Sequence, residues 1–316
     1  MDRPPRNREL ERLVIDVLRA TEVGSPERHE AWQVYADWLL SLGEPVGEWL
    51  AVSLGADDVS DAAAPIRAAL HEIERACSFR LVDLALADLS EVPELSRIAD
   101  LTWERGFITS ARIRTREFRA WDSELLEHTP DRLLEVVLRS PSACVLHSLE
   151  VDACRFHAVG SRHASVAELL AAFAEPLALR SLALGDGRDP LVLAPGMFER
   201  LPELCSLRLT SNQAGRKHDE LREQLAALDP ERLPASLVEL DLRLAAGGDP
   251  VAELFACSPS TERLRALRID HVSDVGAELI IAQRDRFAQL ERFELRHCEL
   301  SQPWSRALAA IGCRFG

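Results

Sequence analysis

The 316-residue sequence has few of the features that mark membrane-spanning or secreted proteins. No apolar run approaches the ~18 residues of a transmembrane helix, and no apolar signal-peptide core follows the charged N-terminus. The seven cysteines are odd in number and include no Cys-x-x-Cys pair, which argues against a disulfide framework or a zinc ribbon. We therefore expect a cytoplasmic protein with free thiols and no membrane partner.

The sequence also has little positive charge. Its net charge is 37 − 52 = −15. Nucleic acid is thus excluded as an expected partner, because phosphate binding needs a basic face. Residues 21–100 hold five arginines against sixteen acidic residues, a net of −11, so the acidity is concentrated near the N-terminus. This segment is interpreted either as a solubilising surface or as an acidic docking surface for a basic partner.

Motifs of catalysis and phosphate binding are missing as well. The chain has no G-x-S-x-G, G-x-x-x-x-G-K-[ST], G-x-G-x-x-G or H-E-x-x-H. The run Cys154-x-x-His157-x5-His163 does not have the spacing of a standard metal site, and it lacks a second pair. We predict a non-catalytic protein without cofactor or metal. Cys77 and Cys313, which lie outside the clear repeat strands, are the only cysteines that an enzyme hypothesis would nominate.

What the sequence does contain is a repeated pattern, L-x-x-L-x-L, where L is any aliphatic or similar residue. Its third anchors are Ile113, Val151, Leu184, Leu209, Leu242, Ile269 and Leu295, with steps of 25 to 38 residues between them. Helix-like stretches lie between the copies at 165–173, 218–228, 249–257 and 274–287. Cys154 and Cys298 stand at the ninth position of their copies, where a small polar side chain can satisfy buried backbone groups.

Residues ~105–300 resemble the leucine-rich repeat proteins through this pattern. The resemblance implies an α/β solenoid with a parallel sheet on the concave face and helices on the convex face. We expect a helical cap over residues 1–104, a repeat array over 105–300 and a C-terminal cap over 301–316, in which Trp304, Leu308 and Ile311 have helical spacing. Caps are needed because the ends of a repeat array would otherwise expose apolar surface.

The N-terminal residues are predicted to be helical. Residues 8–21 carry an apolar helical stripe. Ser25-Pro26 suits the start of a helix that runs to Ser41 and stops at Gly43, and Pro45 opens the next helix. Further helices are expected at 62–77 and 79–89. The run Tyr35-Ala36-Asp37-Trp38-Leu39, followed by Gly43-x-Pro45-x-Gly47-Glu48, resembles the bacterial repeat-companion domain of myxobacteria and planctomycetes. Trp103-x-Arg105-Gly106-Phe107 resembles the element that introduces the first repeat in such proteins. The aromatic residues near Tyr35 are interpreted as core, with a ligand cage as the alternative.

Between the anchors of each strand lie residues that should point to the concave face, because side chains alternate along a strand. The candidate partner-binding residues among them are Arg112, Arg114, Glu150, Asp152, Arg208, Glu239, Asp241, Arg243, Arg268, Asp270, Arg292, Glu294 and Arg296. These charges either pair with one another across strands or form a mosaic that binds a protein. The sequence therefore predicts that the protein is a protein-interaction scaffold. The alternatives are a subunit that docks through its acidic N-terminal module and an enzyme with an unrecognised site.

Overall fold

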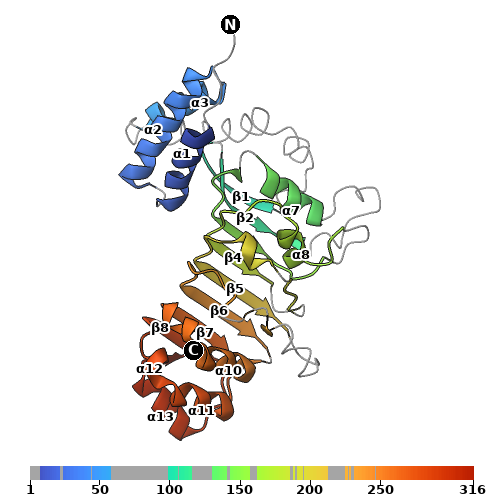
Figure 1. Cartoon of the computed structure of the whole chain (residues 1–316), viewed down its shortest axis with the longest axis vertical. Coiled ribbons are helices and arrows are strands. Elements are labelled where there is room, and N and C mark those ends of the chain that lie inside the picture. Colours follow the sequence, from blue (N-terminus) through green and yellow to red (C-terminus); the bar gives the residue numbers. More distant parts are fainter. Residues whose placement is uncertain are drawn as a thin grey trace. The chain divides into compact units, whose positions relative to one another are not determined.

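A computed structural model describes residues 8–21, 24–43, 45–57, 99–105, 107–115, 130–140, 143–156, 162–185, 188, 191–194, 196–212, 225–226, 228, 231–245 and 247–316 (Figure 1). The chain divides into two compact units. The first unit comprises residues 1–111 and 133–147, and the second comprises residues 112–132 and 148–316. The predicted helices at 62–77, 79–89 and most of 218–228 lie outside the described residues.

The fold is α/β. Within the described part of the chain, nine strands form one mostly parallel sheet in the order of the sequence, β1 to β9. The strands are β1 Ala99–Glu104, β2 Phe107–Ile113, β3 Ser148–Val151, β4 Ser181–Leu184, β5 Ser206–Ser211, β6 Glu239–Leu244, β7 Ala266–Asp270, β8 Arg292–Arg296 and β9 Cys313–Phe315. The α-helices are α1 Arg8–Ala20, α2 Pro26–Ser41, α3 Pro45–Asp57, α7 Pro130–Arg139, α8 Val166–Ala171, α10 Gly248–Cys257, α11 Asp274–Ala282, α12 Arg284–Phe287 and α13 Gln302–Ala310. Short 3₁₀ helices cover Phe198–Arg200 and Pro259–Arg263.

In the first unit, the predicted limits of helix α2 are confirmed. The Ser25 side chain accepts a hydrogen bond from the Arg28 N–H, and Pro26 is the first helical residue. After the helix, Gly43 adopts a φ of 67°, a left-handed conformation that glycine accommodates without steric cost. The aromatic side chains of α2 are buried, and Trp32 packs on Phe107 of β2 with ring centroids 5.2 Å apart. These rings form core, so the interpretation of a ligand cage is wrong.

One part of the predicted helical N-terminal domain is wrong. Residues 99–104 form strand β1, which neighbours β2 in the sheet. The connection between them is two residues long, which only an antiparallel pair allows. The alternation of Ala99, Leu101 and Trp103 with polar residues is the strand period of two.

In the second unit, the repeat anchors set the register of the parallel strands. Leu149, Leu182, Leu207, Leu240, Leu267, Phe293 and Cys313 are partners in successive strands from β3 to β9. All seven are buried. Equivalent positions of each copy therefore stack in one apolar ladder, and the predicted strands at these anchors are confirmed.

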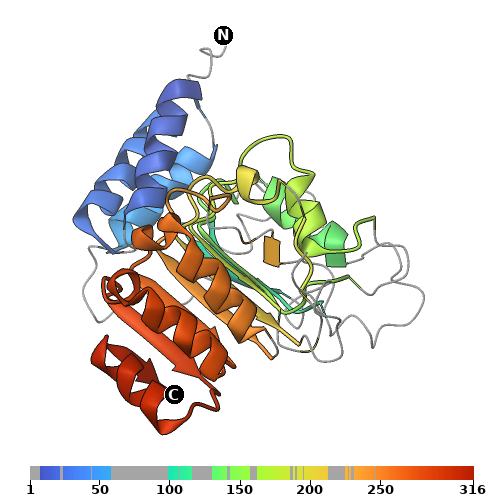
Figure 2. The same cartoon turned by 60° about the horizontal axis from the view of Figure 1, so that its bottom comes forward.

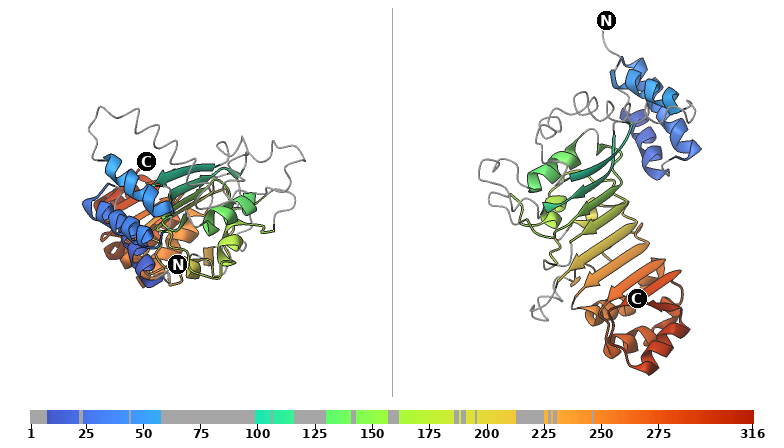
Figure 3. Two further views of the ribbon diagram at one scale, coloured as in Figure 1. Left: turned by 90° about the horizontal axis from the view of Figure 1, so that it is seen from above. Right: turned by 180° about the vertical axis from the view of Figure 1, so that it is seen from behind.

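The helices of the second unit lie on the anchor side of the sheet. The predicted helices at 165–173, 249–257 and 274–287 are confirmed as α8, α10 and the α11–α12 pair. Figure 2 shows α10, α11 and α13 in front of the last strands, and Figure 3 shows strands β4 to β8 from behind. The start of α8 is a capping box, in which Ser165 Oγ accepts from the Glu168 N–H and Glu168 Oε2 accepts from the Ala164 N–H.

The C-terminal residues contain a strand that the sequence reading did not find. Helix α13 forms where helical spacing predicted it and buries Leu308. The chain then returns as β9, which pairs in parallel with β8 through Cys313 opposite Phe293 and Phe315 opposite Leu295. Ala310-x-x-Cys313-x-Phe315 has the anchor spacing of the repeat, so the pattern was present in an unusual composition. The last 16 residues thus extend the sheet as well as adding a helix.

Candidate functional site

The side chains that alternate with the buried anchors define one polar surface of the second unit. On β5 to β9 its charged members are Arg208, Arg243, Arg268, Arg292, Arg296, Arg314, Glu239, Asp241, Asp270 and Glu294. We call this set the charged face. Its middle row alternates in sign, because Arg208, Asp241, Arg268, Glu294 and Arg314 are partners in successive strands.

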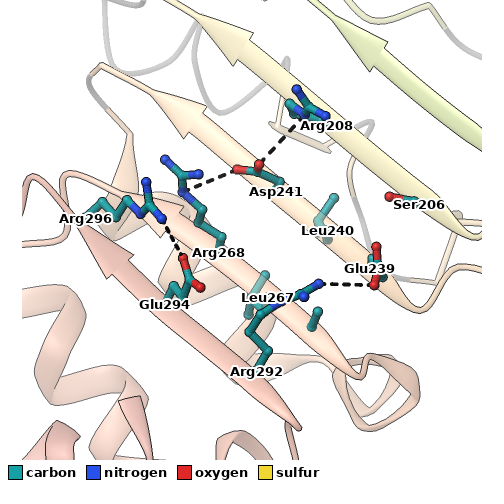
Figure 4. A pocket seen from close by; sticks show the side chains of 11 residues that line it. Ser206, Arg208, Glu239, Leu240, Asp241, Leu267, Arg268, Arg292, Glu294 and Arg296 are labelled. Atoms are coloured by element: carbon teal, nitrogen blue, oxygen red, sulfur yellow. Dashed lines mark hydrogen bonds and ion pairs between the residues drawn. The ribbon is translucent and has the colours of Figure 1, made fainter. Parts of the chain in front are cut away.

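The charged face is hollowed by a pocket of about 330 Å³ (Figure 4). The pocket is lined by Ser206, Arg208, Glu239, Leu240, Asp241, Ala266, Leu267, Arg268, Arg292, Glu294 and Arg296. The small side chains of Ser206 and Ala266 leave space between the longer charged ones. Seven of the predicted partner-binding residues are therefore brought together around one cavity. Ser206 and Ala266 were not predicted, because neutral residues have no charge pattern to reveal them.

Asp241 is the electrostatic centre of this pocket. Arg243 donates from Nε and Nη2 to its carboxylate, with Nη2 2.7 Å from Oδ2. This hydrogen bond, with the nearby negative charge of Asp241, raises the pKa of Arg243 above its ordinary value despite partial burial. Arg268 Nε lies 3.5 Å from Asp241 Oδ1, and Arg208 Nε lies 3.9 Å from Oδ2. One carboxylate thus faces three guanidinium groups from three neighbouring strands.

The remaining acids of the pocket each face one arginine. Arg292 Nη2 lies 3.1 Å from Glu239 Oε1, and Arg296 Nη2 lies 3.1 Å from Glu294 Oε2. Both pairs are partly exposed, and pairs of this kind contribute only about 0–1 kcal/mol to stability. These two ion pairs therefore contribute little to the stability of the fold.

Two predicted site residues are not accessible in the way that strand alternation suggested. Asp270 is buried, with its carboxylate 3.4 Å from Arg268 Nε. The Asp270 side chain is only 8% exposed, so the prediction of an accessible Asp270 is wrong. Asp152 accepts hydrogen bonds from the N–H (2.7 Å) and Oγ1 (2.9 Å) of Thr115, so its carboxylate joins the ends of β2 and β3.

The other predicted residues lie outside the pocket. Arg112 Nε is 3.3 Å from Glu150 Oε1 in an exposed pair. Arg114 is half-buried. Between this pair and the charged face lies β4, whose outward residues are Ser181 and Ala183. The predicted row of charges is therefore interrupted by a neutral strand.

Cys298 and Cys313 lie in environments that disfavour the thiolate. Cys298 Sγ accepts from the Val272 N–H at 3.3 Å and donates to the Arg296 carbonyl at 3.1 Å, which is the backbone role predicted for the ninth repeat position. Burial raises the pKa of the Cys298 thiol, and it raises the pKa of Cys313 to about 12. A thiol with so high a pKa is protonated at neutral pH and is a poor nucleophile. Cys77 and His157 lie outside the described residues. Across the described ranges, no cluster of three or more potential ligands that could hold a metal ion is found.

No helix in the part of the chain that the structure describes is both long and apolar enough to cross a bilayer. No family model and no curated protein matches the chain. A search of solved structures finds similarity to the crystal structure of a Bacteroides fragilis protein from the Northeast Structural Genomics Consortium. The match has 19% sequence identity and a TM-score of 0.41, and it covers 58% of this chain and 48% of that one. The matched region thus spans about half of the length of that protein.

Proposed function

We propose that this chain is a cytoplasmic leucine-rich repeat protein that acts as a non-catalytic interaction scaffold. A protein partner would bind to the charged face, on the side of the sheet opposite the helices. The observation that carries this proposal is the pocket around Asp241, where charged side chains from four strands surround one cavity. The in-register ladder of repeat anchors supports the assignment to a solenoid, since equivalent positions of successive repeats stack in such folds.

The pocket offers donors and charges but no pair of groups arranged for covalent chemistry. Among the described residues, its lining holds one hydroxyl, Ser206, and no imidazole or thiol. A positioned nucleophile and base would be needed for acyl or group transfer. Arginine side chains, by contrast, are enriched at protein interfaces, because the planar guanidinium makes two parallel hydrogen bonds. Binding therefore explains the lining better than catalysis.

The test is affinity capture with the full chain, followed by titration of the purified prey. The variant is Arg208→Glu/Arg292→Glu, which reverses two pocket charges that are 46% and 52% exposed. The control is Arg265→Glu/Arg284→Glu, which makes the same charge change at sites 69% and 71% exposed, outside the pocket lining. We expect the first variant to bind the prey at least about tenfold more weakly and the control to bind like the unchanged protein. Equal binding by both variants would exclude the charged face as the docking site.

A second candidate function is docking through the acidic helices. Glu27, Glu30, Asp37 and Glu48 are exposed on α2 and α3, whereas Arg28 is buried and already paired with Glu104. A basic component of an assembly would fit this surface. Its signature would be a complex that dissociates as salt rises from about 50 to about 300 mM and is unaffected by the pocket variant.

A further inference from the structure

We propose that the charged face recognises an acidic segment of the partner, a stretch rich in aspartate and glutamate. Its carboxylates would be bound by Arg208, Arg268 and Arg292 around the pocket. This inference rests on the proposed function and names the chemistry of the partner at the same site.

The first support is the sign of the charge. The charged face holds six arginines and four acids, a balance of +2, in a chain whose net charge is −15. An acidic partner is repelled by the protein as a whole and attracted at this face. Fields arranged in this way orient the encounter and suppress binding elsewhere on the surface.

The second support is a surplus of hydrogen-bond donors. A guanidinium carries five N–H donors. Arg208 has only the 3.9 Å contact with Asp241, which is longer than a hydrogen bond, among the residues that the structure describes. A ligand that supplies acceptors would satisfy donors on this face, and a carboxylate accepts two from one guanidinium.

The third support is the rigidity of one central donor. The Arg268 side chain is only 15% exposed and is held between Asp241 and Asp270, with its Nε 3.5 and 3.4 Å from their carboxylates. Holding the side chain in advance lowers the entropy cost of binding. Arg208 and Arg292 are about half exposed and lie on the strands at either side of the pocket (Figure 4). A fixed arginine flanked by two accessible ones suits a segment with several carboxylates.

The acidic side chains of the pocket favour a carboxylate-rich peptide over a nucleic acid as the ligand. Glu239, Asp241 and Glu294 alternate with the arginines. A nucleic-acid strand carries a phosphate at every nucleotide, so some phosphates would meet these carboxylates. A peptide can place neutral or basic residues opposite them. The outward side chains of β4, Ser181 and Ala183, are small, which also leaves room for a peptide beside Arg208.

The test is fluorescence anisotropy with the full chain and defined probes. The probes are a labelled oligo-glutamate peptide of about twelve residues, an oligo-lysine peptide and a single-stranded oligonucleotide of similar length. At low salt we expect binding of the glutamate peptide only. The Arg208→Glu/Arg292→Glu variant should bind it at least about tenfold more weakly, and the Arg265→Glu/Arg284→Glu control should retain the affinity within about twofold.

A variant with the opposite sign separates recognition from misfolding. Asp241→Asn removes the carboxylate that neutralises three arginines, so it should bind the glutamate peptide about two- to fivefold more tightly. The amide oxygen that replaces the carboxylate oxygen in this variant is still an acceptor for Arg268, so the substitution removes charge without removing the contact that holds this arginine. Weaker or unchanged binding by Asp241→Asn would overturn the proposal. So would tighter binding of the oligonucleotide or of the lysine peptide, or no detectable affinity for the glutamate peptide. If these probes fail while the captured prey still depends on Arg208 and Arg292, the acidic-segment inference is wrong and the scaffold function stands. If neither peptide binding nor prey binding depends on Arg208 and Arg292, the acidic-segment inference and the scaffold function are both wrong.

Discussion

Arg28 and Glu104 are 76 residues apart in the chain and form an ion pair between α2 and β1, in which Arg28 is buried and Glu104 is 17% exposed. Arg28 Nε lies 2.8 Å from each carboxylate oxygen, and Trp32 Nε1 donates to Glu104 Oε1 at 2.8 Å. Arg28 also donates to the carbonyls of Leu18 and Thr21 near the end of α1. One guanidinium therefore joins α1, α2 and β1 within the first unit.

Breaking this pair should destabilise the first unit strongly. Glu104→Ala leaves the charge of Arg28 buried without its partner, and we expect a loss of about 3–5 kcal/mol in the free energy of unfolding. Urea denaturation followed by tryptophan fluorescence measures it, because Trp32 contacts the pair. The double variant Arg28→Met/Glu104→Leu removes both charges, so its free energy of unfolding should fall less than that of Glu104→Ala. A single variant as stable as the unchanged protein would show that the pair is not buried in solution.

The packing of α3 against α2 depends on Gly47. A Cβ added there would lie 2.5 Å from Leu40 N and 2.8 Å from Leu39 Cβ, closer than atoms can approach. Gly47→Ala should therefore separate the two helices and cost about 1–3 kcal/mol of stability. Gly55→Ala on the same helix is the matched control, because an added Cβ there meets no described atom within 4 Å. That substitution should be neutral or stabilise by up to about 1 kcal/mol. The midpoint temperatures of thermal unfolding of the two variants are compared. Equal midpoints would contradict the close contact at Gly47.

Cys313 should react slowly with alkylating reagents in the folded protein. Burial raises its pKa from 9.0 to about 12, so at pH 8 its thiolate fraction is about a thousandfold below that of an ordinary cysteine. Its alkylation rate should rise about tenfold per pH unit between pH 7 and pH 9, since only the thiolate reacts. Exposed Cys257 on α10 is the internal reference in the same digest, quantified by peptide mass spectrometry. Alkylation of Cys313 as fast as Cys257 near pH 8 would contradict this prediction and support the enzyme hypothesis.

Much of the local structure follows from short-range patterns. Ser25, Pro26 and Gly43 predicted both ends of α2, because caps and helix breakers act through neighbouring backbone groups. The repeat anchors predicted strands β2 to β8 and their buried side chains, because a strand with one buried face has a period of two. The outward position of the pocket residues followed from the same period. The anchor spacing also marked β9, but with Cys and Phe in place of leucine.

The sequence by itself determined the helices α2, α8, α10 and α13, the strands β2 to β8, and which side of each of these strands is apolar. Only the tertiary structure decided which outward charges share a cavity, because the loops between strands vary in length and leave the neighbours of each arginine open. It also decided that Asp270 is buried beside Arg268 and that Arg28 lies beside Glu104. Such contacts join segments distant in the chain, and no local pattern encodes them. The charge of an isolated arginine is visible in the sequence, whereas its burial and its partners arise only when the chain folds.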